Sequence, residues 1–349
     1  MDDIRFALIG AGNIGYIYVK AFSHVPDGAI TVVCDAVPAA GEALAEECGA
    51  VFEPDFHVAV ERADVDAVII ATPSGTHAEI AVTAARAGKH LLVEKPLDIT
   101  LGRVDSIIDA AEHADVILGC VLPLRLSEGV RQAKNALDAG RLGTLTLADA
   151  YVKWYRPQSY YDGSWRGTWK LDGGGALMNQ SIHNIDLVQY LAGPVESVVG
   201  RTATLAHDME TEDTASAVLT YRGGAMGVIQ GSTSSWPGEQ ARVELHGDQG
   251  TIVLEEGRVT VWRLADADDA EEAMILGTTG EGGTGAADPL AIGYEKHRRQ
   301  IADFIGALQE YRSPAIMGAE ARRSVEIIRA IYYSARTGFP VNLPYTDDM

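Results

Sequence analysis

The chain has 349 residues, of which 47% are hydrophobic and 22% charged, so it has the length of two ordinary domains and the composition of a globular protein. Its 28 Lys and Arg residues face 49 Asp and Glu residues, which gives a formal net charge of −21. This charge repels a polyanion at long range, so nucleic acid is not an expected partner.

No apolar run approaches the ~20 residues that a membrane-spanning helix needs, so no membrane association is expected. The first residues lead directly into the apolar run 6–9 without the pattern of a signal peptide, which predicts a cytoplasmic location. Cys34, Cys48 and Cys120 lack CxxC spacing and lie among small or apolar residues. We expect them to be reduced packing residues.

In residues 4–120, short apolar runs alternate with longer helical stretches, which predicts a parallel sheet wound by helices. The predicted strands are 4–9, 30–34, 67–71, 90–93 and 116–120. Thr76 and Glu79 have the spacing of a capping box at the start of a helix that ends near residue 86. A second helix is predicted over 101–112.

The pattern changes after residue 122. Alternating runs over 145–154, 215–221 and 225–230 predict antiparallel strands. The predicted helices are 128–138, 175–191, 294–308 and 319–334, and Gly193-Pro194 would end the second of them. The Gly-rich stretch Gly277 to Gly285 is typical of an exposed loop or crossover.

A glycine-rich turn, Gly10-Ala11-Gly12-Asn13-Ile14-Gly15, follows the first predicted strand and opens a helix. In a dinucleotide fingerprint the first glycine forms the tight turn, the second lets the backbone approach the pyrophosphate, and the third allows close packing of helix and strand. Asp35 follows at the end of the second strand, about 20 residues on, where a carboxylate can bind both ribose hydroxyls. No Arg or Lys lies between Asp35 and Gly49 to bind a 2′-phosphate, so NAD is predicted in preference to NADP.

Two further turns are expected at the ligand-binding edge of the same sheet. One is Ala71-Thr72-Pro73-Ser74-Gly75-Thr76-His77, in which His77 either contacts the cofactor or lies in the first turn of a helix. The other contains Glu94-Lys95-Pro96. A lysine seldom ends a buried strand without a partner, so Lys95 is either exposed or catalytic. Cofactor contacts are predicted for Gly10, Gly12, Asn13, Ile14, Gly15, Asp35, Ala71, Thr72, Pro73, His77, Glu94 and Lys95.

These motifs, together with the run 87–97, the segment Asp172 to Asp186 and Ser334-Ala335 in the closing helices, resemble the glucose-fructose oxidoreductase and inositol dehydrogenase family. The resemblance implies an α/β chain with a doubly wound Rossmann domain over 1–123. It implies a second α/β domain over 124–349 with a large, open, mostly antiparallel sheet, and final helices that are able to pack back on the first domain. In that family the sheet forms subunit interfaces, so a homodimer or homotetramer is expected.

The resemblance also implies that Lys95 and His183 act beside the nicotinamide. A neutral imidazole can take the proton of an alcohol as its hydride leaves, and Lys95 can stabilise the developing alkoxide. Many members have aspartate four residues before the histidine, where this chain has Asn179, so no negative charge is expected beside His183 from that position. Asn179 can bind substrate or orient the imidazole from the same helical face. The predicted activity is NAD-dependent oxidation of a secondary alcohol in a sugar, sugar derivative or inositol.

Substrate recognition is predicted in the stretch Tyr160 to Lys170, where aromatic rings suit the apolar faces of sugars and cations suit their hydroxyls. Trp165 and Arg166 are the candidates there. Lys153 and Arg125, at positions that face the cleft in the family, are further candidates, whereas Tyr294 and His297 are interpreted as helix packing.

Two other functions stay open. The enzyme could retain its NAD and use transient oxidation for glycoside cleavage or epimerisation through a keto-sugar. A non-enzymatic NAD-binding regulator is the other, although it would not need both Lys95 and His183. No HExxH and no ligand set for a zinc alcohol dehydrogenase is found, so no metal is expected.

Overall fold

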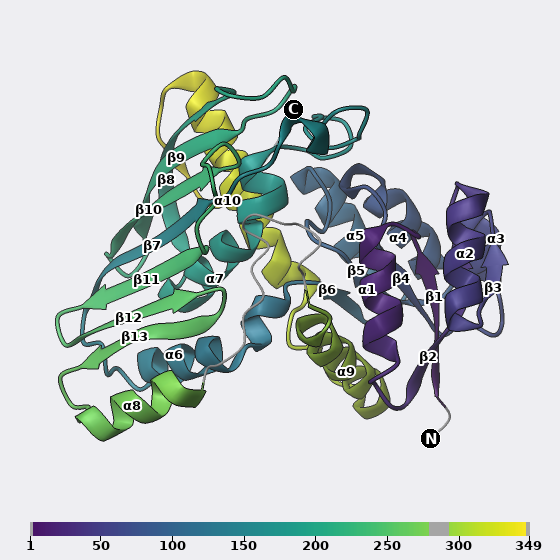
Figure 1. Ribbon diagram of the computed structural model, residues 1–349, viewed down its shortest axis with the longest axis horizontal. Helices are drawn as coiled ribbons and strands as arrows, with labels where there is room; N and C mark the ends of the chain where they lie inside the picture. Colours follow the sequence, from purple (N-terminus) through teal and green to yellow (C-terminus); the bar gives the residue numbers. More distant parts are fainter. Residues whose placement is uncertain (1–2, 279–292, 347–349) are drawn as a thin grey trace. The chain divides into compact units, whose positions relative to one another are not determined.

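The computed structural model describes residues 3–278 and 293–346 (Figure 1). Two compact units form from the chain: residues 1–123 with 293–322, and residues 124–292 with 323–349. A segment from far along the sequence therefore completes the first unit. Both predicted sheets are present, so the predicted α/β fold class is confirmed.

The first unit is built on six parallel strands in the order β3-β2-β1-β4-β5-β6. The order reverses between β1 and β4, and ligands of such sheets bind at the carboxyl ends of the strands beside this point. The strands are β1 (Ile4–Ile9), β2 (Gly28–Cys34), β3 (Val51–Glu53), β4 (Ala67–Ile70), β5 (His90–Val93) and β6 (Leu118–Cys120). The three-residue strand β3 was not predicted, since it is too short to show a period.

The helices of the first unit are α1 (Asn13–Phe22), α2 (Pro38–Cys48), α3 (Phe56–Glu61), α4 (His77–Arg86), α5 (Leu101–His113) and α9 (Glu295–Glu310). Helix α9 places Ile301, Phe304 and Ile305 in the same core as Phe6 and Phe22 of the N-terminal segment. Just before α9, Tyr294 stacks on His24, and within it His297 meets Tyr18 edge to face. Both residues therefore pack as the sequence predicted.

The start of α4 differs from the predicted capping box. Thr76 makes no capping bond, because it ends a short 3-10 turn (Ser74–Thr76) and its hydroxyl donates to the Pro73 carbonyl at 2.7 Å. Asp98 instead accepts a hydrogen bond from the backbone N–H of Ala78 at 2.8 Å. The cap is supplied by a residue beyond the next strand, which a local pattern does not reveal.

The second unit contains an eight-stranded sheet in the order β13-β12-β11-β7-β10-β9-β8-β14. Every neighbouring pair is antiparallel except β7 and β10. The strands are β7 (Leu145–Lys153), β8 (Val195–Ala203), β9 (Thr214–Tyr221), β10 (Met226–Ser232), β11 (Arg242–Gly247), β12 (Gly250–Glu255), β13 (Arg258–Leu264) and β14 (Val341–Asn342). This is the mostly antiparallel sheet that the resemblance implied.

Helices α6 (Glu128–Asp138) and α7 (Ile182–Ala192) pack against one face of this sheet (Figure 1). Helix α8 is Asp269–Thr278, and the division of the chain between the two units falls within α10 (Gly318–Thr337) after Arg322. The predicted Gly-rich loop lies outside the described residues from position 279 onward. Among the described residues, no helix combines the length and hydropathy needed to cross a bilayer.

The predicted helix over 175–191 has two parts. Residues Ala176–Ser181 form a π-helix, and α7 continues from Ile182. The Ser181 hydroxyl donates to the Ala176 carbonyl at 2.7 Å, within the widened turn. Such π-helical turns are rare and occur frequently at functional sites.

Candidate functional site

The glycine-rich turn after β1 has the geometry that a dinucleotide needs. Gly10 has φ of +112°, and a Cβ there would lie 2.5 Å from the Ala71 carbonyl oxygen, while a Cβ at Gly15 would lie 2.7 Å from the Gly10 oxygen. A Cβ at Gly12 would meet nothing within 4 Å. Packing therefore explains why glycine is needed at positions 10 and 15 but not at position 12. The absence of a side chain at Gly12 suits close approach of a pyrophosphate to the backbone at the start of α1.

Asp35 is fixed beside this turn. Its Oδ2 accepts a hydrogen bond from the backbone N–H of Ala11 at 2.7 Å, and its Oδ1 accepts from Val37 at 2.8 Å. Each carboxylate oxygen retains a lone pair for a ribose hydroxyl. Asn13 and Ile14 begin α1 directly after the turn, and Asn13 is exposed. The residues of this part of the chain fit NAD.

The turn after β4 lies beside the glycine-rich turn, because the Ala71 N–H donates to the Ile9 carbonyl at 2.8 Å. Ala71, Thr72 and Pro73 are partly exposed there. His77 is only 1% exposed, and its two ring nitrogens lie 2.9 Å from the Pro96 carbonyl and 3.0 Å from the Thr72 carbonyl. The His77 ring thus joins the turns after β4 and β5 with its polar atoms facing the protein, and its predicted cofactor contact stays a prediction.

The turn after β5 separates the roles of Glu94 and Lys95. The Glu94 carboxylate is buried, accepts hydrogen bonds from the Tyr18 hydroxyl at 2.9 Å and the Lys95 N–H at 3.2 Å, and lies 3.6 Å from His297 Nε2. Burial opposes ionisation, but His297 and the other partners outweigh it and hold the pKa of Glu94 below its ordinary value. Its side chain is bonded within the protein, and its predicted cofactor contact stays a prediction.

Lys95 is presented by a buried turn. Every residue of 91–99 is described, and Lys95 alone among them is partly exposed. Its position at the carboxyl end of β5 is the one predicted for a residue that acts on bound ligand.

In the second unit, Asn179 and His183 emerge from buried surroundings. The structure describes all of 172–189, and only these two side chains of that stretch are partly exposed. Asn179 lies on the π-helix and His183 in the first turn of α7, so one helical surface presents both. The sequence predicted that these two side chains share a helical face, and their joint role at the substrate stays a prediction.

A buried carboxylate that sequence reasoning missed lies against Asn179. The Asn179 amide donates to Asp172 Oδ1 at 2.5 Å, and Asp172 Oδ2 accepts from the Gly167 N–H at 2.8 Å. Asp172 therefore places a carboxylate against Asn179 from the start of the glycine run, which was not predicted from the sequence, and the expectation for His183 stays a prediction.

Arg125 is part of a buried ion pair. Its Nε and Nη2 donate to the two carboxylate oxygens of Asp186, each at 2.6 Å, and its guanidinium lies 4.5 Å from the centre of the Tyr190 ring. Asp186 lies on α7, where an uncompensated charge would be costly. Arg125 was predicted to bind substrate; in the structure its guanidinium pairs with a residue of α7, and the contact with substrate stays a prediction.

Lys153 ends β7 on the side of the sheet that faces away from α7. Ala150 and Val152 are buried toward the helices, whereas Lys153 shares the other face with Tyr151 and lies 5.5 Å from its ring centre. Its predicted contact with substrate is therefore not supported by its position, because alternation along the strand directs it away from His183.

The predicted aromatic stretch lies next to the helix that carries Asn179. Arg166 lies 4.6 Å from the Tyr160 ring centre and 5.1 Å from that of Trp165. The Tyr160 hydroxyl accepts from the amide of Gln180, the residue after Asn179, at 3.4 Å. Trp165 and Arg166 are thus held in a loop that is attached to the π-helix.

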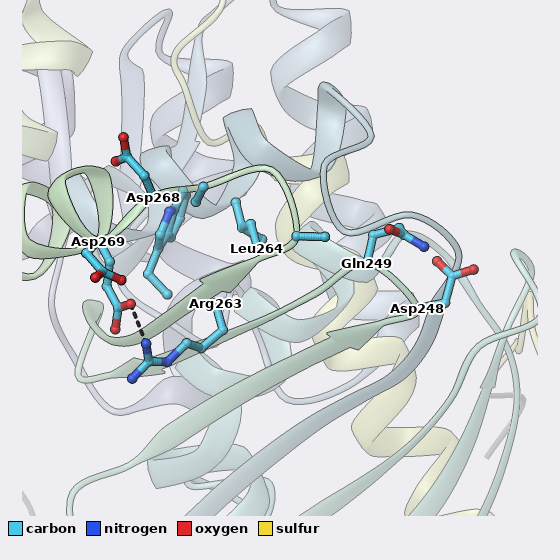
Figure 2. Close-up of a pocket in the computed structure, with 10 residues that line it drawn as sticks. Asp248, Gln249, Arg263, Leu264, Asp268 and Asp269 are labelled. Atoms are coloured by element: carbon cyan, nitrogen blue, oxygen red, sulfur yellow. Dashed lines mark hydrogen bonds and ion pairs between the residues drawn. The ribbon is translucent and has the colours of Figure 1, made fainter.

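Two other clusters lie apart from these residues. A pocket of about 420 Å³ beside β13 and α8 contains none of the predicted site residues (Figure 2). It is lined by acidic groups such as Asp248 and Asp268, and its Arg263 is paired with Glu272 at 2.5 Å. Asp149, Glu244 and His246 place possible metal ligands within 4.8 Å of one another, but Arg242 already pairs with Glu244.

Comparison with known families accounts for both units. Residues 4–121 match the model of an oxidoreductase family with an NAD-binding Rossmann fold, and residues 130–253 match the GFO/IDH/MocA C-terminal domain. The chain belongs to the GFO/IDH/MocA oxidoreductase family. The predicted family and enzyme class, an NAD-binding oxidoreductase, are thereby confirmed.

Several GFO/IDH/MocA relatives have named activities. Inositol 2-dehydrogenase of Rhizobium meliloti is 32% identical over 76% of this chain and 79% of its own length. Levoglucosan dehydrogenase of Pseudarthrobacter phenanthrenivorans is 26% identical over 99% of both chains. The WlbA dehydrogenase of Bordetella pertussis, solved with NADH and UDP-GlcNAcA, superimposes with a TM-score of 0.89 at 32% identity over 99% of both chains.

Proposed function

We propose that the protein oxidises a secondary alcohol of a sugar, sugar derivative or inositol with NAD. The observation that carries this proposal is the selective exposure of Lys95, Asn179 and His183 from otherwise buried segments. These residues are a cation, an amide and an imidazole, which suit charge stabilisation, hydrogen bonding and proton transfer at an alcohol. The activities of the named relatives support this substrate class.

Bound NAD would accept the hydride from the carbinol carbon. His183, as a neutral imidazole, takes the proton of the same hydroxyl and returns it in the reverse reaction. Lys95 stabilises the negative charge that develops on the oxygen. Asn179 positions the hydroxyl or the imidazole, with its own amide oriented by Asp172.

Trp165 and Arg166 would recognise the sugar. An indole offers a flat apolar surface to a pyranose ring, and a guanidinium donates to its hydroxyls. The contacts of Arg166 with the Tyr160 and Trp165 rings restrict the guanidinium, so less conformational freedom is lost on binding.

The proposal is tested by measuring NADH release with inositols, aldoses, glycosides and anhydrosugars, beside a His183→Ala protein. Release of NADH with at least one class, and its loss in His183→Ala, is the expected result. Cleavage or epimerisation without added NAD and without NADH release would instead establish the redox-neutral alternative. NAD binding without any turnover would favour a regulator.

We propose that NAD is preferred over NADP because the Asp35 carboxylate repels a 2′-phosphate. Asp35→Ser is expected to lower the ratio of kcat/KM for NAD to that for NADP by about tenfold or more, since close like charges cost several kcal/mol. Asp35→Asn also removes the charge and is the matched variant, because its amide oxygen can still accept the hydrogen bond from the Ala11 N–H. Equal use of both cofactors by the wild-type enzyme would contradict the proposal.

We also propose that a second copy of the chain covers the open face of the large sheet, giving a homodimer or homotetramer. Val199, Val218 and Val228 are cross-strand neighbours there, and Leu147 is paired with Met226. Four of these five are exposed, which forms the kind of apolar patch that interfaces cover. Sedimentation should detect an oligomer that Val218→Asp dissociates, and a wild-type monomer at micromolar concentration would contradict this.

A further inference from the structure

One residue, Glu212, occupies the start of the helix that carries Asn179. Its Oε2 accepts from the Gly175 N–H at 3.0 Å, its Oε1 accepts from the Leu177 N–H at 2.9 Å, and its backbone carbonyl accepts from Ala176 at 2.9 Å. Three successive N–H groups that a helix start leaves without intrahelical partners are thus satisfied by a residue just before β9. Glu212 is 3% exposed, so these hydrogen bonds are shielded from solvent.

A second element supports this carboxylate. The Tyr332 hydroxyl, from α10, donates to Glu212 Oε1 at 2.9 Å. Both residues approach the glycine run so closely that side chains are excluded: a Cβ at Gly175 would lie 1.9 Å from the Glu212 carbonyl oxygen, and one at Gly174 would lie 2.1 Å from the Tyr332 hydroxyl. The glycines of this motif therefore make room for Glu212 and Tyr332.

We propose that Glu212, supported by Tyr332, is a positioning residue that sets the places of Asn179 and His183 in the reaction. The Asn179 N–H donates to the Gly175 carbonyl at 3.0 Å, so a shift of the capped residues moves the π-helix with it. This inference rests on the proposed roles of Asn179 and His183. It adds a residue that touches neither substrate nor cofactor and acts through the helix.

The charge of Glu212 gives the proposal a measurable signature. Burial raises the pKa of Glu212 to about 7, against the opposing effect of the Leu177 and Gly175 N–H groups and the Tyr332 hydroxyl. Asp172 and Arg329 also act electrostatically on Tyr332, with opposite signs. A protonated carboxyl has a donor where an acceptor was, so it cannot accept from all three groups in the same way.

Activity and stability should therefore respond to pH in opposite directions. The pKa of Glu212 is raised in the folded protein, so its contribution to stability is full below its ordinary value of 4.5 and is lost as pH rises through about 7. The ionised form is the one that holds the helix, so its contribution to turnover appears as pH rises through the same range. A residue that only stabilised the fold would not give activity and stability opposite dependences on pH.

Glu212→Gln tests this, with Asp213→Asn as the matched control. Asp213 is equally buried but accepts from the backbone of a different loop, at Leu205 and Ala206, and these donors hold its pKa below the ordinary value despite burial. At pH 8, Glu212→Gln should lower kcat about 10- to 100-fold, as small misplacements of reacting groups do, with the Kd for NAD unchanged. The ratio of wild-type to Glu212→Gln kcat/KM should shrink as pH falls below 7, and the ratio for Asp213→Asn should stay constant.

The ratio cancels those effects of pH on activity that both proteins share. A wild-type to Glu212→Gln ratio that does not change between pH 6 and 8 would overturn the proposal, as would a kcat that is unaffected.

Tyr332→Phe gives a second measurement if Glu212→Gln folds poorly. Loss of a hydrogen bond to the carboxylate should move the Glu212-dependent step in kcat/KM to higher pH, and an unmoved step would contradict the role of Tyr332. An active His183→Ala protein would show that the proposed function is wrong. If His183→Ala is inactive and Glu212→Gln keeps wild-type activity, only the inference about Glu212 is wrong.

Discussion

Lys95→Met is expected to lower kcat/KM for alcohol oxidation by about 10²-fold or more, because a fixed positive charge near a developing alkoxide is a large part of such catalysis. The fold should be unaffected, since Lys95 is the one partly exposed side chain of its turn and methionine matches its length. The Kd for NAD, measured by nicotinamide fluorescence, should stay close to the wild-type value.

Lys95→Arg is the control for this prediction. It keeps the positive charge but replaces a compact ammonium with a planar guanidinium, so activity should be intermediate between the wild type and Lys95→Met. A loss below about tenfold in Lys95→Met would mean that the ammonium group does not act on the reacting oxygen.

Arg125→Met is expected to reduce the free energy of unfolding by about 3–5 kcal/mol, because it leaves the buried Asp186 carboxylate without its counter-charge. Denaturant unfolding followed by intrinsic fluorescence would measure the loss. The double variant Arg125→Met, Asp186→Leu should recover most of it, since apolar groups of similar volume can replace a buried pair.

This experiment distinguishes the predicted substrate contact of Arg125 from a structural role of its ion pair with Asp186. If Arg125→Met unfolds like the wild type but raises KM for the sugar, the arginine binds substrate after all. If stability falls and the double variant restores it, the ion pair serves to hold α7.

The fold around the proposed cofactor site could be predicted because its signals are local. The glycine-rich turn, the strand before it and Asp35 lie within 35 residues, and the structure brings Asp35 to the backbone of Ala11. The role of Lys95 is predicted by the same logic, since strand ends of a parallel sheet share an edge.

The rest depended on partners that are distant in sequence. The sequence did not indicate that Arg125 pairs with Asp186, which lies 61 residues further along the chain. Nor did it indicate that Asp98, and not Thr76, caps α4. Glu212 gave no local signal, because the N–H groups that it accepts from lie 35 and 37 residues away. A glycine run indicates that something approaches the backbone, but only the fold identifies it.

The place of α9 in the first unit has a consequence for biosynthesis. Ile301, Phe304 and Ile305 fill a core whose other members include Phe6 and Phe22, so the nascent Rossmann segment emerges with this apolar surface uncovered. Residues 124–292 must be synthesised before α9 can cover it. The second unit also contains residues 323–349, so both units depend on the last part of the chain, and neither can complete its fold before that part is synthesised.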